Sequence, residues 1–133
     1  MESRELGEEQ HVSFKFEKLR VWQKAIELTD LVYEVTRSFP REEMFGLTSQ
    51  VRRAAVSVAA NIAEGVSRVS AKDRARFFEV SYGSVNEVVT MFHIASRQKI
   101  VEADSVKRVR SEADDLCRML SGLRSSVLKS AQQ

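Results

Sequence analysis

The sequence predicts an all-α protein, an antiparallel four-helix bundle with up-down-up-down connectivity. In four long segments the apolar residues recur at steps of three and four, which is the period of amphipathic helices. The breaks between these segments are short, and short connections between long helices favour antiparallel neighbours. The chain has one proline and five glycines, too few for an all-β or loop-rich protein.

Composition places the chain among single-domain globular proteins. Its 133 residues fit one domain with a modest core, and 43% hydrophobic and 30% charged residues are ordinary values. No apolar run is long enough to span a bilayer, and the start, MESRELGEEQ, lacks the apolar segment of a signal peptide. We therefore expect a cytoplasmic protein without a membrane partner. Residues 1–13 are predicted to form a flexible acidic arm and residues 14–133 the four-helix bundle domain.

The first helix is predicted over about 17–38. One stripe of residues repeats at steps of three and four: Trp22, Ala25, Ile26, Thr29, Val32, Tyr33 and Thr36. A second apolar stripe consists of Val21, Leu28, Leu31 and Val35. An apolar surface this wide predicts a helix that is covered on more than one side. Since a bundle helix needs one broad apolar face, the surplus predicts burial between subunits.

The second helix is predicted over about 46–64, after the break SFPREEMFG. Pro40 cannot continue the first helix but suits the first turn of a new segment. The core stripe of the second helix consists of Leu47, Val51, Ala54, Val58 and Ile62. Gly65 is predicted to end this helix in a left-handed cap conformation, which costs glycine little.

The third and fourth helices have the clearest signals. Ser70 is predicted to cap the third, which runs to about Gln98, because Asp73 follows three residues later as in a capping box. Gly83 and Ser84 inside it indicate a kink or a close helix contact. The fourth helix begins near Asp104 and carries a heptad seam, which predicts a nearly antiparallel or parallel partner along its length. The seam consists of Val106, Val109, Ala113, Leu116, Leu120, Leu123 and Val127.

A polar stripe follows the second helix beside its apolar stripe. It consists of Gln50, Arg53, Ser57, Asn61 and Glu64, and Gly65 follows directly. Small neighbours such as Ala60 allow another backbone to come close, so the stripe does not resemble a solvated charged face. Three interpretations remain open: a polar network between helices or subunits, a ligand or nucleic-acid surface, and a catalytic site. If Glu64 is buried in such a network, replacing it with alanine should cost about 1–3 kcal/mol.

Basic residues concentrate in the middle of the chain, although the net charge is only +2. Arg68, Lys72, Arg74 and Arg76 surround the predicted start of the third helix. Basic side chains and free backbone N–H groups there suit a phosphate backbone, while a plain solvated loop is the alternative. A second basic run, 107–110, is interpreted as an exposed helix face.

Signals for catalysis, metals and cofactors are lacking in the sequence. His11 and His93 are far apart, and Cys117 lies beside a helical apolar stripe, where it suits a small buried hydrophobe. There is no glycine-rich phosphate loop, no CxxC pair and no nucleophile elbow. Glu64 has no second carboxylate, histidine or nucleophile at a useful spacing. We therefore predict that the protein is not an enzyme and that it binds neither a metal ion nor a cofactor.

Four sequence blocks together resemble one protein family. They are FEKLRVWQKAIEL, SFPREEMFGLTSQVRRAAVSVAANIAEG, YGSVNEV and LCRMLSGL, and they lie within residues 14–128. The family is the four-helix bundle proteins encoded in intervening sequences of bacterial large-subunit ribosomal RNA genes. The fold is more distantly similar to the accessory protein of diversity-generating retroelements. The acidic arm lies outside the resemblance.

The resemblance implies a small antiparallel bundle that assembles into a ring, typically a homopentamer, with a role related to nucleic acid. Its signature positions fall on Gln50, Arg53, Ser57, Asn61, Glu64 and Gly65, and on Gly83, Ser84 and Glu87. The leading hypothesis is a non-enzymatic, self-associating bundle that binds RNA, DNA or a nucleoprotein partner. The alternative is a structural or protein-interaction module, such as an accessory subunit of a larger complex.

Overall fold

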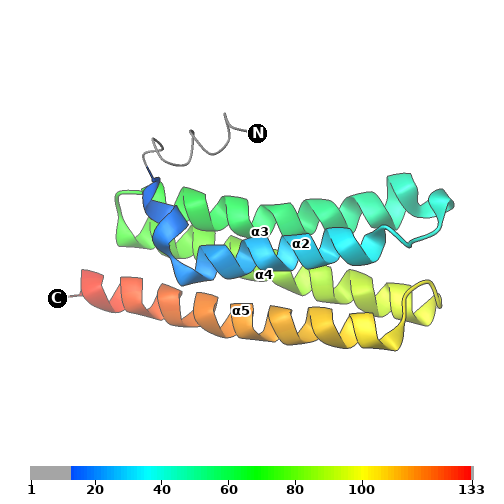
Figure 1. The fold of residues 1–133 in the computed structure, drawn as a ribbon. Coiled ribbons are helices and arrows are strands. Elements are labelled where there is room, and N and C mark those ends of the chain that lie inside the picture. Colours follow the sequence, from blue (N-terminus) through cyan, green and yellow to red (C-terminus); the bar gives the residue numbers. More distant parts are fainter. Residues whose placement is uncertain (1–12, 133) are drawn as a thin grey trace.

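The computed structural model describes residues 13–132, and in this range the chain contains four long α-helices and no strand. They are α2 (Arg20–Thr36), α3 (Ser49–Ser67), α4 (Ala71–Arg97) and α5 (Ala103–Ala131). Consecutive helices run in opposite directions, and each packs against two neighbours in the cyclic order α2, α3, α4, α5 (Figure 1). The predicted all-α class is therefore confirmed. The predicted arm lies almost entirely outside the described residues.

Three short elements modify the predicted helix boundaries. A 3₁₀ helix, η1 (Lys15–Lys18), precedes α2, and the extended backbone of Leu19 separates the two. A second 3₁₀ turn, η2 (Arg41–Glu43), follows Pro40 and leads into a π-helix, η3 (Met44–Thr48). The first predicted helix is thus two elements, and the second is preceded by a short π-helical segment that is kinked at Gly46.

Helix α4 begins as predicted, with the Ser70 side chain accepting a hydrogen bond from the backbone N–H of Asp73 at 3.1 Å. The helix continues without interruption to Arg97. Of the two outcomes expected at 83–84, the structure therefore shows the close contact, made by Ser84, and α4 has no break there.

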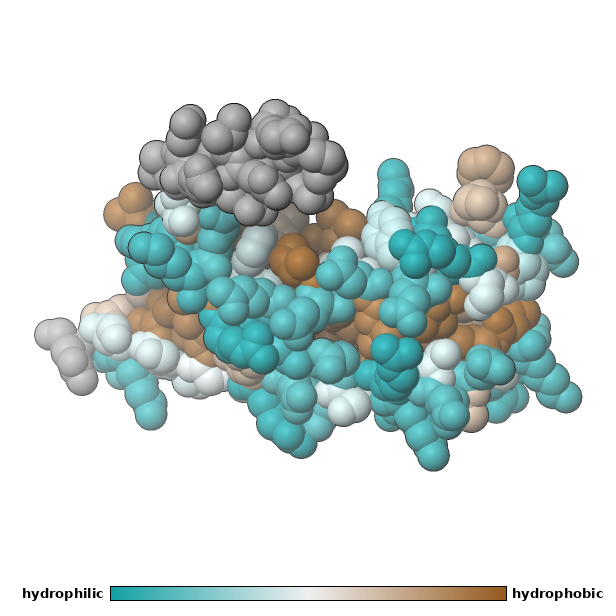
Figure 2. Space-filling model, in the orientation of Figure 1, coloured by the Kyte–Doolittle hydropathy of each residue, from teal (hydrophilic) through white to brown (hydrophobic). Residues whose placement is uncertain are grey.

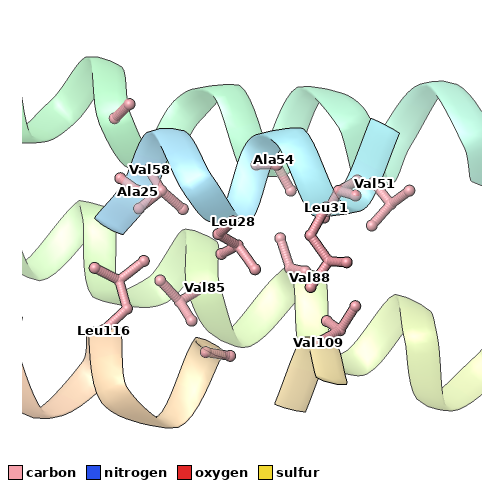
Figure 3. Close-up of a cluster of buried hydrophobic side chains, with 14 of the residues drawn as sticks. Ala25, Leu28, Leu31, Val51, Ala54, Val58, Val85, Val88, Val109 and Leu116 are labelled. Atoms are coloured by element: carbon pink, nitrogen blue, oxygen red, sulfur yellow. The ribbon is translucent and has the colours of Figure 1, made fainter. Parts of the chain in front are cut away.

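The core lies along the bundle axis and draws on all four helices (Figure 3). Its fully buried large side chains include Leu28, Ile62, Phe92, Leu116 and Leu120. The second apolar stripe of α2 belongs to this core, with Leu28 completely buried and Leu31 only 7% exposed. That stripe is therefore no surplus for a subunit interface, because α2 packs against both α3 and α5. The apolar side chains of α2 that remain exposed belong to the first stripe, Ile26 and Tyr33.

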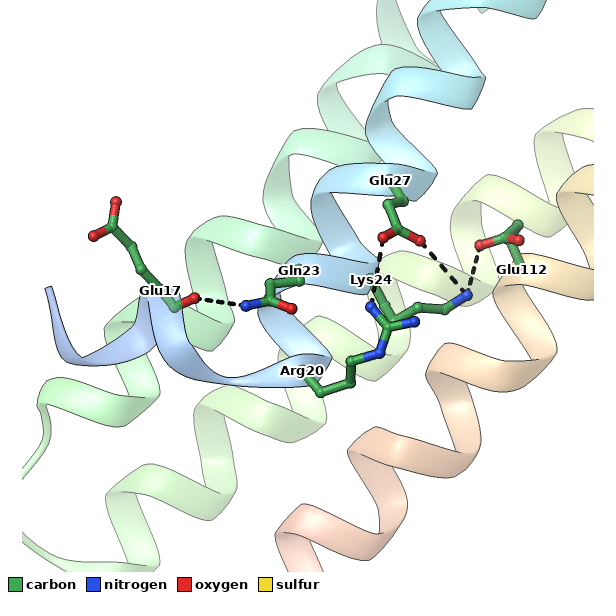
Figure 4. Close-up of polar contacts among 6 residues, drawn as sticks. All are labelled: Glu17, Arg20, Gln23, Lys24, Glu27 and Glu112. Carbon is green, nitrogen blue, oxygen red and sulfur yellow. Dashed lines mark hydrogen bonds and ion pairs between the residues drawn. The ribbon is translucent and has the colours of Figure 1, made fainter. Parts of the chain in front are cut away.

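A charged clamp holds α2 to α5 at the edge of the core (Figure 4). The Nζ of Lys24 donates to Oε1 of Glu112 at 2.9 Å and lies 3.8 Å from a carboxylate oxygen of Glu27. The Lys24 side chain is only 11% exposed. Its hydrogen bond to Glu112 raises the pKa of Lys24 above its usual value, although burial opposes the charge.

Several large apolar side chains remain on the surface, and the space-filling view shows apolar atoms standing out at the end of the molecule where η2 and η3 lie (Figure 2). Phe45 is 97% exposed and Val69 is 94% exposed. Met44, Val56 and Tyr33 are also exposed. Within residues 13–132, no helix is both long and apolar enough to cross a membrane.

Candidate functional site

The polar stripe of α3 divides into an inner and an outer part. The inner part joins α3 to α4: Nδ2 of Asn61 donates to the carbonyl oxygen of Ser57 at 2.8 Å and to its Oγ at 2.9 Å. The Ser57 hydroxyl in turn hydrogen-bonds the Ser84 hydroxyl of α4 at 2.9 Å. One turn away, buried Ser81 donates to the carbonyl oxygen of Val58 at 2.8 Å. Short polar side chains therefore fix the register of the α3–α4 contact.

The outer part of the stripe faces away from α4. Gln50 and Arg53 are exposed, with no hydrogen-bond partner among residues 13–132. Glu64 is 47% exposed in its side chain and pairs with Arg68 one turn later. Glu64 is therefore not buried in a polar network. Its replacement with alanine should not carry the cost of about 1–3 kcal/mol that a buried carboxylate would have.

Gly65 has a different role from the predicted helix cap. It lies inside α3, two residues before the end, and no described glycine has a positive φ. A Cβ on Gly65 would come within 2.7 Å of the ring of Phe78 and 3.1 Å of the Cβ of Phe77. The glycine is therefore needed because α4 packs directly on the α3 backbone at this point.

An open groove of about 640 Å³ runs along the outer surface of α3. We call it the α3 groove; its lining is Tyr33, Met44, Phe45, Thr48, Ser49, Arg52, Arg53, Val56, Ser57, Ala60 and Asn61. The Nε of Arg52 donates to Oγ1 of Thr36 at 2.9 Å, and its guanidinium stacks 4.6 Å from the centroid of the Tyr33 ring. The buried Oγ1 of Thr48 has no hydrogen-bond partner among the described residues.

Sequence reasoning found the polar half of the α3 groove and missed its apolar half. The π-helix turns Phe45 out into solvent. A periodic pattern does not reveal this local break, in which Gly46 has non-helical backbone angles (φ −115°, ψ −109°). The signal in the sequence was the break SFPREEMFG, which places Met44 and Phe45 outside the periodic stripes of both helices.

The four basic residues at the start of α4 differ in their surroundings. Nη1 of Arg74 donates to the backbone carbonyl oxygens of Arg68 and Val69, at 3.3 and 2.9 Å, and so braces the α3–α4 loop. Arg68 pairs with Glu64. Lys72 and Arg76 are exposed and have no acidic partner among the described residues. Of the four, Lys72 and Arg76 are therefore the two that have neither an acidic partner nor a bond to a backbone carbonyl oxygen among the described residues.

Phe77 fixes the positions of two of these guanidinium groups. The guanidinium carbons of Arg68 and Arg76 each lie 4.7 Å from the centroid of its ring. Such stacking holds an arginine side chain in place while its N–H groups remain available. A shallow groove of about 380 Å³ lies beside them; its lining is Lys72, Asp73, Ala75, Arg76, Glu79, Arg124 and Leu128.

The second basic run and Cys117 lie on α5. Lys107 and Arg110 are exposed on α5, and Arg108 lies 3.6 Å from a carboxylate oxygen of Glu34. Cys117 is half-buried, and burial is the main cause that raises the pKa of its thiol. Over residues 13–132, no three side chains of the types His, Cys, Asp or Glu are grouped so that they could hold a metal ion.

The two polar residues at the end of the stripe are expected to differ in their effect on stability. Asn61→Ala removes the bonds to Ser57 and should lower the free energy of unfolding by about 1 kcal/mol. Glu64→Ala removes only an exposed ion pair and should change it by less than about 0.5 kcal/mol. Urea denaturation of both variants checks this. A larger loss for Glu64→Ala than for Asn61→Ala would contradict it.

Comparison with known proteins identifies a family and a similar solved structure. The family model described as "23S rRNA-intervening sequence protein" matches residues 17–122. A solved structure from Bacteroides thetaiotaomicron, a protein of unknown function from the S23 ribosomal protein family, superposes with a TM-score of 0.73. It shares 17% sequence identity, over 79% of this chain and 95% of that one. Among curated proteins, none is a significant match to this sequence.

Proposed function

Because the chain belongs to the family of 23S rRNA-intervening sequence proteins, we propose that it is a non-enzymatic, self-associating four-helix bundle that binds the backbone of RNA or DNA in the cytoplasm. The nucleic acid can be bound free or within a nucleoprotein. The assembly that we propose is a ring, and the resemblance favours a homopentamer. The basic residues at the start of α4 make the contact.

One observation supports the nucleic-acid contact above others: the exposed pair Lys72 and Arg76. Both side chains lie on the first two turns of α4, and neither has an acidic partner among the described residues. Arg76 is oriented by its stacking on Phe77. Charges held in this way suit phosphate oxygens, which are recognised by charge and position rather than by base sequence.

The overall charge of the bundle also supports this contact. Residues 13–133 contain 20 of the 21 basic residues and 15 of the 19 acidic ones, a formal charge of +5. Dedicated RNA-binding domains are usually more basic than this. A ring repeats Lys72 and Arg76 in every subunit along one rim, so the assembly presents a higher local charge than one copy does.

The test is a binding titration with labelled single-stranded and double-stranded RNA and DNA at two salt concentrations. We expect binding that weakens steeply with salt. Lys72→Gln with Arg76→Gln should weaken binding of all sequences alike. The same double substitution should reduce the salt dependence, the slope of log Kd against log salt, by about one for each phosphate that is no longer neutralised. The matched control is Lys107→Gln with Arg110→Gln, which removes the same charge from α5.

Each outcome of this titration is informative. A larger effect of the α5 control would place the contact on α5. If the parent protein binds neither RNA nor DNA at low salt, the nucleic-acid part of the proposal is wrong. The alternative, a protein-interaction module, would then stand, and the 97% exposed ring of Phe45 beside the α3 groove favours it.

Measuring the mass in solution, with and without nuclease treatment, separates self-association from co-purified nucleic acid. A stable monomer at micromolar concentration would contradict self-association.

A further inference from the structure

A second groove lies on another side of the bundle, between α2 and α5. We call it the α2–α5 groove; it has a volume of about 400 Å³ and its lining is Glu27, Asp30, Leu31, Glu34, Arg108, Ser111 and Glu112. On this side of the molecule, hydrophilic side chains border and partly cover the apolar residues beneath (Figure 2). Glu27 and Glu112 face each other across it, with Lys24 between them (Figure 4).

The two grooves carry opposite charges. The lining of the α3 groove includes Arg52 and Arg53, and none of the described residues that line it is acidic. Arg52 bonds the Thr36 hydroxyl and stacks on the Tyr33 ring, and it has no ion pair among residues 13–132. Arg53 is exposed. The α3 groove therefore presents two positive charges that no carboxylate in its lining balances.

The α2–α5 groove has an excess of carboxylates. Four acidic residues and one basic residue line it. Glu27 and Glu112 share Lys24, and Glu34 lies 3.6 Å from Arg108. Glu27 also lies 3.5 Å from Arg20, so each of these three glutamates has a basic partner. Asp30 is exposed and has no basic partner among the described residues. Asp30 is therefore the carboxylate of this lining that is left for a basic group of a second molecule.

We propose that the α3 groove of one copy docks onto the α2–α5 groove of the next copy, with Arg53 facing Asp30. This inference rests on the self-association proposed above and specifies its surfaces. Complementary charge fixes the register of an interface and disfavours wrong partners. The exposed Phe45, Met44 and Val56 supply the apolar area that such a contact removes from water.

Charge also decides against a two-fold pairing of the α3 groove with itself. In that arrangement Arg52 and Arg53 of both copies would meet without a carboxylate in the lining, and juxtaposed like charges are costly. A contact between two different surfaces leaves one free groove of each kind on every dimer. It therefore continues from copy to copy, as head-to-tail interfaces do, until it closes into a ring or extends as a filament.

The unpartnered Thr48 hydroxyl supports an occupied α3 groove. Thr48 is 4% exposed and lines the groove, and its Oγ1 has no hydrogen-bond partner within residues 13–132. A buried hydroxyl without a partner costs free energy. A polar group of the next copy can remove this cost when it docks.

Charge reversal tests the proposal, with the mass in solution measured by light scattering over a dilution series. Arg53→Glu and Asp30→Arg should each raise the dissociation constant of the assembly by about tenfold or more. The double variant that carries both reversals restores the opposite-charge pair at every interface, so it should assemble to within about threefold of the parent. Arg110→Glu and Asp104→Arg, exposed and outside both grooves, are the matched controls and should assemble like the parent.

The outcomes separate this inference from the proposed function. A monomeric parent would contradict self-association itself. If the parent assembles but Asp30→Arg assembles equally well, or the double variant stays dissociated, the pairing of these two grooves is wrong. Far-ultraviolet circular dichroism should show unchanged helix content in every variant, because neither Arg53 nor Asp30 is buried.

Discussion

Replacing Phe92 with alanine is expected to lower the free energy of unfolding by about 3–5 kcal/mol, the largest effect that we predict for a single substitution. Phe92 is 1% exposed, and its ring meets that of Phe39 edge to face, with centroids 6.0 Å apart. Alanine removes both the buried apolar area and this aromatic contact, and it leaves a cavity that the surrounding helices fill only in part. Urea denaturation monitored by circular dichroism measures the change.

Phe45→Ala is the control for this prediction, because it is the same substitution at a 97% exposed ring. At dilutions where the protein is monomeric, Phe45→Ala should change stability by no more than about 0.5 kcal/mol. At higher concentration it should weaken the assembly, and the apparent stability would fall accordingly. A loss below about 1 kcal/mol for Phe92→Ala would contradict the packing of Phe92 in the core.

Gly65→Ala is expected to destabilise the protein by about 1–3 kcal/mol, although alanine is the better helix former. The new Cβ would lie 2.7 Å from the ring of Phe78, which is itself 2% exposed in the core. Because this ring is packed, it cannot move aside without disturbing its neighbours. Thermal or urea denaturation measures the destabilisation.

The matched control is Gly83→Ala, in the middle of α4. A Cβ on Gly83 meets no atom within 4 Å, so only the gain in helix propensity remains, about 0.5–1 kcal/mol of stabilisation. In addition, Phe78→Leu should reduce the cost of Gly65→Ala, because the smaller side chain leaves room for the Cβ. A double-mutant cycle between the two positions measures this coupling, and additivity would mean that Phe78 is not the cause.

The candidate sites could be predicted only in part. The spacing of Ser57 and Asn61 on one face was visible in the sequence, and so was the cluster of four cations at 68–76. That Arg74 turns back to the loop carbonyl oxygens while Lys72 stays exposed depends on the path of the chain between α3 and α4. The sequence shows which side chains are charged. Whether a charged side chain is free to contact a ligand depends on the backbone groups that it bonds in the fold.

The α2–α5 groove was not predictable, because its walls come from distant parts of the chain. Glu27 and Glu112 are 85 positions apart, and their shared contact with Lys24 exists only once α2 lies beside α5. In the sequence these glutamates cannot be distinguished from ordinary charged residues on the exposed face of a helix. A groove between helices requires the packing order, which periodicity alone does not specify.

The sequence by itself determined the fold class, the number of long helices and the cap at Ser70, because these depend on local spacing and on hydrogen bonds within one turn. The tertiary structure alone decided which faces are covered. It placed the second stripe of α2 in the core, gave Gly65 its role beneath Phe78, and exposed Phe45 on the π-helix. The physical reason is that burial and close approach are properties of pairs of elements, whereas periodicity describes one element at a time.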